Sequence, residues 1–292
     1  MGGGTYSSTT RTVRADSMGY TTKSVGEIFT QRSINNAMSP YDLGARESKD
    51  SAEHPNSYAI SIALDVTGSM GSVPHFLVKD GLPNIMQSII DAGVPDPQLL
   101  FMGIGDHVFD QAPVQIGQFE SSDELLDKWL TDLWLEGGGG NNNGESYLLA
   151  WYVAAMHTNI DCFNNRSQKG VLFTIGDEPV LESIPVRELQ NIFGAGQYKE
   201  YSAAKLFEMA KEKYHVYHIH IRSTGSGRRQ SVMDGWIQLL RDNCLIAQNQ
   251  EMVAEIISST VLKHYGEVRG SIGVVPQIPE DAGESKTEEI IL

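Results

Sequence analysis

Short apolar runs that carry no charge alternate along the chain with segments in which apolar residues recur every three or four positions. The uncharged runs are typical of buried strands in a parallel sheet, and the second pattern is typical of amphipathic helices. Strands are expected at 58–64, 97–105, 170–176 and 215–221, and helices at 82–90, 121–134, 147–158, 201–214 and 249–266. This alternation predicts an α/β fold with a doubly wound, mostly parallel sheet and helices on both faces.

Two local features modify this pattern. Residues 112–119 form another short apolar stretch, so close to the strand at 97–105 that the two are expected to pair as a hairpin, which makes the later one an antiparallel edge strand. Pro83 lies inside the helical segment 73–93. Because proline has no N–H to donate, we expect a kink or a break near Gly81.

The chain divides into three regions by composition. Residues 1–57 are rich in Gly, Ser, Thr and Asn and have too few apolar residues to bury a core, so a mostly irregular N-terminal arm with one short helix within 23–38 is expected. Residues 58–268 hold the α/β domain, and residues 269–292 form an acidic tail. The arm is expected to serve assembly or docking.

Composition favours a cytoplasmic protein. The 292 residues are 40% hydrophobic and 20% charged, which is usual for a globular chain. No apolar run approaches the ~18 residues that span a bilayer, and residues 1–17 lack the apolar segment of a secretory signal. Cys162 and Cys244 form no CxxC pair and are expected to be reduced structural thiols.

The charge balance argues against two classes of partner. A formal net charge of −15 disfavours sequence-independent binding to nucleic acid and binding to anionic membranes, since both need clustered cations. The visible basic cluster, at 226–230, is interpreted as a charged surface loop. A protein partner is therefore expected, with no nucleic acid and no membrane.

Oxygen-bearing side chains gather where the predicted strands end. In a doubly wound sheet the loops after the carboxyl ends of the strands carry the functional groups. Here these loops hold Asp65, Thr67 and Ser69 after the first strand, and then Asp106, Asp177, Glu178 and the Gly- and Asn-rich loop 137–144. Oxygen ligands without His or Cys suit Mg²⁺, Mn²⁺ or Ca²⁺. The spacing of Asp65, Thr67 and Ser69 on a turning loop predicts that they converge on one such ion.

Four familiar motifs that begin with an acid or a glycine turn do not fit the stretch 60–72. An EF-hand loop beginning at Asp65 needs Glu at its twelfth position, where Phe76 stands. A P-loop needs a Gly-Lys pair, which the sequence does not contain, and a nucleophile elbow needs Gly where Thr67 stands. A phosphohydrolase of the haloacid dehalogenase type needs a second acid at the same position.

The remaining pattern, Asp-x-Thr-x-Ser at 65–69, resembles the metal-ion-dependent adhesion site of von Willebrand factor A domains, usually Asp-x-Ser-x-Ser. Three later segments are similar to segments of intracellular members of that family, and they occur in the same order: 105–119, 137–146 and 172–179. The resemblance covers roughly residues 58–265. It implies that Asp65, Thr67, Ser69, Asn142 and Asp177 surround a divalent ion, with Asn141 or Asn143 as alternatives to Asn142.

The resemblance also implies a function. Two carboxylates balance the charge of Mg²⁺ and leave one coordination position for an acidic residue of a protein partner, so the chain is expected to bind and not to catalyse. Family precedent allows a AAA-type ATPase or another large assembly as the partner. Asn142 stands where the family has Thr or Asp, which lowers the charge of the site.

Two further functions remain open at this point. One is a metal-dependent phosphohydrolase with Asp65 as the nucleophile, and the other is a structural assembly protein whose metal site is empty. Simpler interpretations also exist for single residues: a polar turn for 65–69, core packing for His218 and His220, and favourable interaction with a helix dipole for Glu145. The aromatic residues of 147–154 are interpreted as core.

Overall fold

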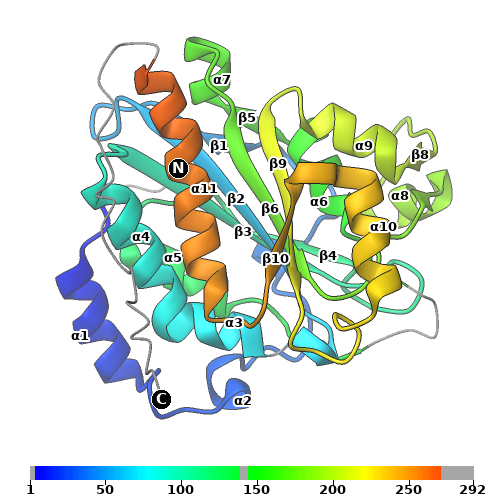
Figure 1. Cartoon of the computed structure of the whole chain (residues 1–292), viewed down its shortest axis with the longest axis horizontal. Helices are drawn as coiled ribbons and strands as arrows, with labels where there is room; N and C mark the ends of the chain where they lie inside the picture. The colour runs from blue at the N-terminus through cyan, green and yellow to red at the C-terminus, as the bar shows by residue number, and fades with distance from the viewer. Residues whose placement is uncertain (1–3, 71, 139–143, 271–292) are drawn as a thin grey trace, which may run out of the picture.

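The computed structural model describes residues 4–70, 72–138 and 144–270. In this part of the chain the central sheet has six strands in the order β10-β9-β6-β2-β3-β4 (Figure 1). They are β2 (Ser57–Asp65), β3 (Asp96–Ile104), β4 (Val114–Ile116), β6 (Gly170–Gly176), β9 (Tyr214–Ile221) and β10 (Cys244–Ala247). All neighbouring pairs are parallel except β3 and β4. The predicted fold class is confirmed, including the antiparallel edge strand.

Helices cover both faces of the sheet, as predicted. They are α1 (Ser8–Met18), α2 (Val25–Ile28), α3 (Ser72–Phe76), α4 (Leu82–Asp91), α5 (Asp123–Thr131), α6 (Leu148–Met156), α7 (Asp161–Arg166), α8 (Val186–Phe193), α9 (Ala203–Ala210), α10 (Gln230–Leu240) and α11 (Met252–Gly270). Short 3-10 turns lie at Asn36–Met38, Gly68–Met70 and Arg241–Asn243. Two pairs of short strands lie outside the central sheet: β1 (Arg46–Ser48) with β5 (Thr158–Ile160), and β7 (Ser183–Ile184) with β8 (Tyr201–Ser202).

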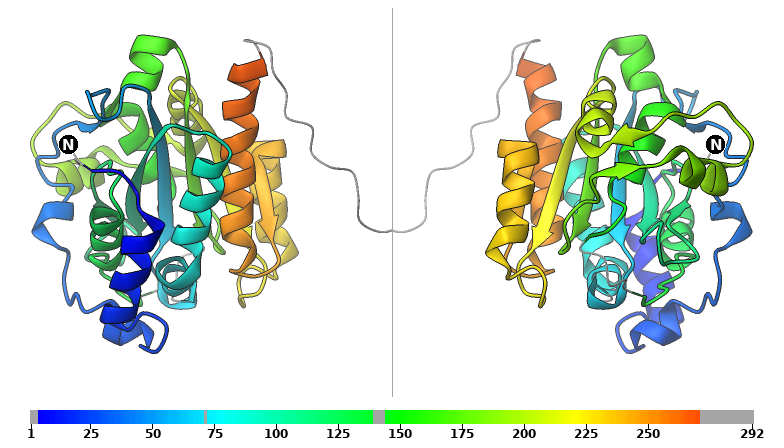
Figure 2. Two further views of the ribbon diagram at one scale, coloured as in Figure 1. Left: turned by 90° about the vertical axis from the view of Figure 1, so that its left-hand side faces the viewer. Right: turned by 90° about the vertical axis from the view of Figure 1, so that its right-hand side faces the viewer.

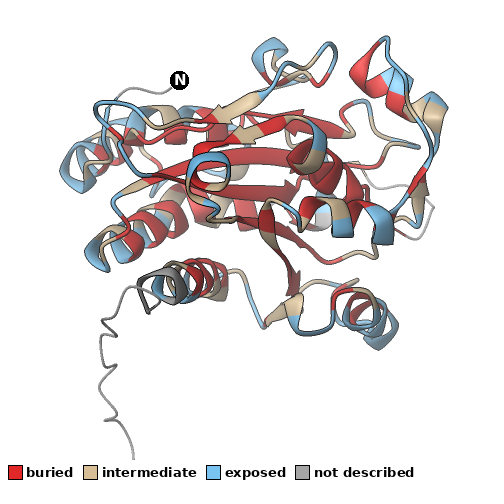
Figure 3. Ribbon diagram, turned by 90° about the horizontal axis from the view of Figure 1, so that it is seen from above, coloured by how far each residue is buried: buried red, intermediate tan, exposed pale blue. Residues whose placement is uncertain are grey.

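The core lies between the sheet and its helices. On one face α11 packs against α4, and Tyr58 of β2 meets Tyr265 of α11 with ring centroids 5.5 Å apart (Figures 1 and 2). On the other face Trp151 of α6 contacts Phe207 of α9 and Trp236 of α10. Figure 3 shows that the central strands of the sheet are buried while the helices expose their outer surfaces. This two-sided burial explains why the strands read as uncharged apolar runs.

The helical segment that contains Pro83 changes register without breaking. α3 passes into α4 through one π-helical stretch, Leu77–Gly81, in which the N–H of Leu82 donates to the carbonyl of Leu77. Pro83 stands at the start of α4, where a missing N–H is tolerated. The irregularity expected near Gly81 is therefore confirmed as a change of register, and the chain stays helical from Ser72 to Asp91.

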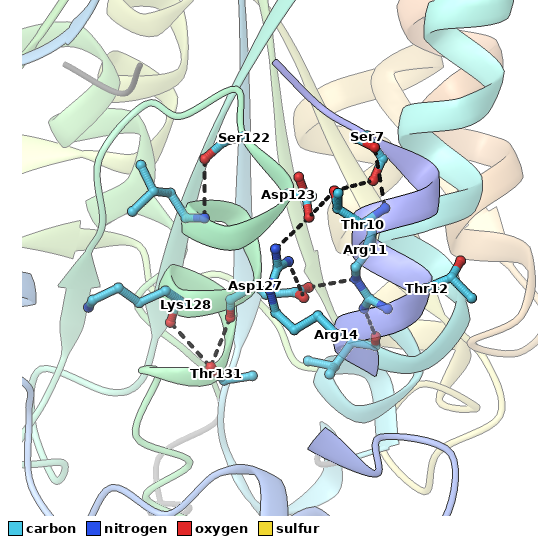
Figure 4. Close-up of polar contacts among 12 residues, drawn as sticks. Ser7, Thr10, Arg11, Thr12, Arg14, Ser122, Asp123, Asp127, Lys128 and Thr131 are labelled. Atoms are coloured by element: carbon cyan, nitrogen blue, oxygen red, sulfur yellow. Dashed lines mark hydrogen bonds and ion pairs between the residues drawn. The ribbon is translucent and has the colours of Figure 1, made fainter. Parts of the chain in front are cut away.

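The N-terminal arm contains a helix that the sequence pattern does not predict, α1, and the short helix expected within 23–38, α2. Ion pairs join α1 to α5 (Figure 4): Arg11 Nε lies 2.8 Å from Asp127 Oδ1, and Arg14 Nη2 lies 2.6 Å from Asp123 Oδ2. Arg11 and Asp127 are both buried. Ion pairs therefore hold α1 against α5, whereas most surface helices pack through an apolar stripe. The division into arm, domain and tail stays a prediction.

No helix in the described ranges combines the length and the apolar character that crossing a membrane requires. Both cysteines are free thiols, with Cys162 buried and Cys244 half-buried, as the sequence predicts.

Candidate functional site

The strand order brings the loops of interest to one edge of the sheet. β2 lies between β3 and β6 and is parallel to both, so the residues that follow these three strands meet at the same edge. The connection after β2 leads to β3 and the connection after β6 leads to β9 on the other side, and doubly wound sheets form their crevice at such a point. Side chains alternate along a strand, so Asp65 faces away from the Tyr58 side and toward α6.

Asp65 is the last residue of β2 and is fully buried. Its Oδ1 accepts hydrogen bonds from the amide and the hydroxyl of Thr67, at 2.8 and 2.5 Å, and its Oδ2 accepts one from Tyr147 Oη at 2.6 Å. Burial raises the pKa of Asp65 to about 7, although the hydrogen bonds from Thr67 and Tyr147 oppose that rise. Charge repulsion from Asp177 raises the pKa of Asp65 further, so the two carboxylates are near enough to interact.

Two of the predicted ligands are joined directly and a third lies close by. The Thr67 hydroxyl donates a hydrogen bond to Asp65 Oδ1, and the lone pairs of its oxygen stay available to accept or to ligate a cation. Asp177 follows β6 and is fully buried. The side chain of Ser69 lies outside the described residues, as do Asn142 and its alternatives Asn141 and Asn143. The loop before them reaches this edge, since Gly68 N donates to Gly138 O at 3.1 Å.

The loop after β3 adds two further carboxylates. Asp106 is fully buried and accepts from Val108 N through Oδ1, at 2.8 Å, while Asp110 Oδ2 accepts from Asp106 N at 2.7 Å. His107 lies beside them and contacts Ser146 Oγ at 2.8 Å through its ring. Burial lowers the pKa of His107, so the ring is neutral near pH 7 and adds no positive charge.

The loop after β6 is held in place by α10. Glu178 pairs with Arg229 at 2.5 Å, and its carbonyl accepts from Trp236 Nε1 at 2.9 Å. Trp236 also stacks on His218, with ring centroids 3.5 Å apart. His218 and His220 are both buried, so the core role predicted for them is confirmed. Arg229, which belongs to the basic cluster at 226–230, holds this loop through its ion pair with Glu178.

Tyr147 was expected to be core, and it is fully buried, but its hydroxyl also caps Asp65. The ring occupies the space beside Gly176, where an added Cβ would lie 1.8 Å from Tyr147 Oη. Any larger residue at 176 would displace the tyrosine from Asp65. Nothing in the residue pattern separates this hydroxyl from the neighbouring core aromatics, which is why the sequence did not identify it.

Glu145 belongs to the same edge. Its N–H donates to Pro179 O at 2.8 Å and its carbonyl accepts from Leu181 N at 3.1 Å, which ties the start of α6 to the loop after β6. The side chain is buried, and burial followed by repulsion from Asp65 raises the pKa of Glu145 to about 9. Burial and the neighbouring carboxylates, rather than a helix dipole, are the main influences on the pKa of Glu145.

This pKa leads to a testable pH dependence. The unfolded chain ionises Glu145 near its ordinary value of 4.5 and the folded chain near 9, so its contribution to stability is full at low pH and is lost as pH rises between these values. Glu145→Gln should therefore stabilise the metal-free protein at pH 8, by on the order of a few kcal/mol, and change little at pH 4. Urea unfolding in EDTA at both pH values measures this, with Glu124→Gln at an exposed position as control. Equal effects of the two variants at pH 8 would contradict it.

The donor chemistry of the edge fits a hard divalent cation. Asp106 Oδ2 and Glu145 Oε2 are buried and have no hydrogen-bond partner among the described residues. Such oxygens are costly unless a donor or a cation satisfies them. In the described ranges no three His, Cys, Asp or Glu side chains form a metal-binding group by themselves. A cation site that also uses hydroxyl and amide oxygens, as the sequence predicts, stays a prediction.

No protein-family model matches the sequence, and the comparison with curated proteins found no match. Among solved structures, the chain is similar to the pilus adhesin SpaC of Lactobacillus rhamnosus GG, with a TM-score of 0.49 and 11% identity over 77% of this chain and 31% of the adhesin. It is also similar to a von Willebrand factor type A protein of Catenulispora acidiphila, with a TM-score of 0.41 and 13% identity over 72% of this chain and 43% of that one.

A third similar structure is the conserved hypothetical protein BatB of Bacteroides thetaiotaomicron, with a TM-score of 0.40 and 12% identity over 72% of this chain and 99% of that one. The solved structures that resemble this chain thus include a von Willebrand factor type A protein. The chain spans less than half of the adhesin and of the Catenulispora protein. These likenesses concern the fold.

Proposed function

We propose that this chain is a divalent-cation-dependent protein-binding module of the von Willebrand factor A type, and that it acts in a larger assembly. The observation that carries the proposal is the oxygen cluster at the ends of β2 and β6, where Asp65 and Thr67 are hydrogen-bonded and Asp177 is buried beside them. Mg²⁺, or Mn²⁺ or Ca²⁺, is the ion such donors select. Ser69 and Asn142 are the remaining ligands in this proposal.

The residues of the chain have distinct parts in this function. When bound, the ion supplies a positive charge with a coordination position for a carboxylate of the partner protein. Asp65 and Asp177 balance its charge, and Thr67 fixes the orientation of Asp65 through two hydrogen bonds. Tyr147 donates to Oδ2 of Asp65 and Thr67 donates to Oδ1, so both oxygens of this carboxylate are held in position.

A groove next to the loop after β3 supports a docking role. Its volume is about 300 Å³, and it lies between the arm, the loop after β3 and α8, with Asp110 and Glu188 in its lining. Val108 and Phe109 stand next to Asp106 and are 58% and 56% exposed. Exposed apolar residues grouped at a polar site are typical of protein-binding surfaces. We expect the partner to place its acidic residue on the ion and apolar or basic side chains against this groove.

The alternative of a phosphohydrolase is disfavoured by the surroundings of Asp65. A phosphohydrolase of the haloacid dehalogenase type needs a second acid two residues after its nucleophile, where this chain has Thr67, whose hydroxyl donates to Asp65. A non-enzymatic binding role is therefore proposed. The identity of the partner, whether a AAA-type ATPase or another large assembly, stays a prediction, as does the cytoplasmic location.

Thermal unfolding with and without a cation tests the proposal. Mg²⁺ at ~100 times its dissociation constant should stabilise the wild-type protein by roughly 2.7 kcal/mol relative to EDTA. Thr67→Val keeps the shape of the side chain and removes the hydroxyl, so the Mg²⁺-dependent shift should largely disappear. Asp242→Asn, at an exposed position of the turn Arg241–Asn243, removes one negative charge away from the cluster and should leave the shift intact.

Two results would contradict the proposal: no Mg²⁺, Mn²⁺ or Ca²⁺ shift in the wild type, or an unchanged shift in Thr67→Val. The first of these would favour the structural assembly protein with an empty site. Turnover of a generic phosphomonoester that is lost in Asp65→Ala would instead favour the enzyme.

A further inference from the structure

The helix that follows the proposed site contains one buried carbonyl that lacks its ordinary helical donor. It begins at Ser72, directly after the Asp-x-Thr-x-Ser stretch, and changes register in the π-helical segment Leu77–Gly81. In an α-helix the N–H of Leu82 would donate to the carbonyl of Val78, but here it donates to the carbonyl of Leu77. Val78 O therefore loses its ordinary donor.

The next residue cannot replace that donor. In π-helical register the carbonyl of Val78 would accept from the backbone nitrogen of residue 83, which is a proline and has no N–H. Val78 is buried, so solvent offers no easy substitute. A buried carbonyl without a donor is costly, and the segment needs an outside group to keep this register.

Arg11 of α1 supplies that group. Its Nη2 donates to Val78 O, and its Nε donates to Asp127 Oδ1 at 2.8 Å (Figure 4). The side chain is almost fully buried, at 2% exposed, and its guanidinium carbon lies 5.3 Å from the centre of the Tyr20 ring. One arginine thus links the N-terminal helix, α5 and the register change in the helix that follows the site.

We infer that Arg11 is a positioning residue of the strand-end site, and that docking of α1 regulates the affinity of this site for the cation. Converting the π-helical turn to α-helix would shift one half of the helix against the other by one residue, which is about 100° of rotation and 1.5 Å of rise. Val73 and Leu77 are fully packed in the first half, and this half connects directly to Thr67 and Ser69. Release of Arg11 would therefore move the ligand loop. The inference rests on the proposed function.

The test uses variants that avoid an unpaired buried charge. Arg11→Met combined with Asp127→Leu removes the ion pair as a unit and leaves Val78 O without its donor. Adding Pro83→Ala restores a backbone N–H that can reach this carbonyl. Arg14→Met is the matched control, because Arg14 lies on the same helix and pairs with Asp123 and Asp127 but does not contact the π-helical segment.

Calorimetric titration with Mg²⁺ on the full chain gives the main readout. The double variant should bind Mg²⁺ about five- to tenfold more weakly, as expected for the loss of about one buried hydrogen bond. The triple variant should recover most of the affinity, and Arg14→Met should match the wild type. Unchanged affinity in the double variant, or no recovery with Pro83→Ala, would overturn the inference.

A second readout does not depend on metal. Amide hydrogen exchange in EDTA should be faster at residues 77–84 in the double variant, and slower again in the triple variant. If the wild type binds no cation, the proposed function fails, and this exchange pattern alone decides whether Arg11 holds the register. Equal exchange in all variants would overturn that part too.

Discussion

Arg11→Met is expected to lower the free energy of unfolding by about 3 to 5 kcal/mol, because it leaves the buried carboxylate of Asp127 without its main partner. Burial already raises the pKa of Asp127 against the opposing effect of Arg11 and Arg14. Urea unfolding at pH 7 measures the loss as a fall in the midpoint concentration.

The pH dependence and the second-site variant identify the cause. Burial raises the pKa of Asp127 above its unfolded value, so its contribution to stability is full at low pH and is lost as pH rises, and the defect of Arg11→Met should shrink as pH falls. Asp127→Leu added to Arg11→Met should restore much of the loss at pH 7. Arg14→Met should cost less, since that side chain is 24% exposed and Asp127 keeps Arg11. A defect independent of pH and of Asp127 would show that the unpaired carboxylate is not the cause.

Trp236→Ala is expected to cost about 3 to 5 kcal/mol, the range for truncation of a large buried aromatic residue. The indole stacks on His218 with an angle of 8° between the rings, and it contacts Tyr147 and Trp151 edge to face. Its loss would open a cavity under α6 and α10 together. Thermal and urea unfolding in EDTA measure this cost separately from any effect of a cation.

A conservative variant separates packing from the hydrogen bond. Trp236→Phe keeps an aromatic ring but removes the N–H that donates to Glu178 O, so it should lose less than Trp236→Ala, with about 1 kcal/mol of the loss from the hydrogen bond. The loop that holds Asp177 should become more mobile in both variants. If the two variants lost equal stability, the stacking on His218 would contribute little, and the hydrogen bond to the loop would be the main effect.

Much of the sheet could be predicted from the residue pattern. β2, β3, β6 and β9 are buried on both faces, and such strands appear in the sequence as uncharged runs of about strand length. The antiparallel edge strand β4 could be predicted from its closeness to β3. Pro83 signalled the irregularity near Gly81, because proline removes a donor whatever the register of the helix.

The elements that the pattern did not predict are held by contacts distant in sequence. β10 has four residues at the edge of the sheet, and the first three are only half-buried. Its apolar run is too short to predict a strand, and no alternation of apolar and polar residues extends it. α1 packs through Arg11 and Ala15, and a buried arginine looks like a surface residue until its partner on α5 is known. Contacts between residues so far apart in the sequence cannot be predicted from a local pattern of residues.

The candidate site was only partly visible in the sequence. Asp65 and Thr67 are two residues apart, and a polar pair after a buried strand is a local signal that the structure shows as a hydrogen bond. Tyr147 and Glu145 come from the start of another helix, and their roles depend on the spacing between strands and not on any motif. The metal-binding role of Asp65, Thr67, Ser69, Asn142 and Asp177 stays a prediction.

The contact between α1 and α5 also has a consequence for synthesis of the chain. Arg11 and Asp127 are 116 residues apart in sequence, and at 5–20 residues per second the ribosome needs roughly 6 to 23 s to make the residues between them. During that time the first helix has emerged but its binding surface has not. A nascent chain therefore exposes Arg11 to solvent and to chaperones until α5 is complete, and protection of α1 from proteolysis would mark that moment.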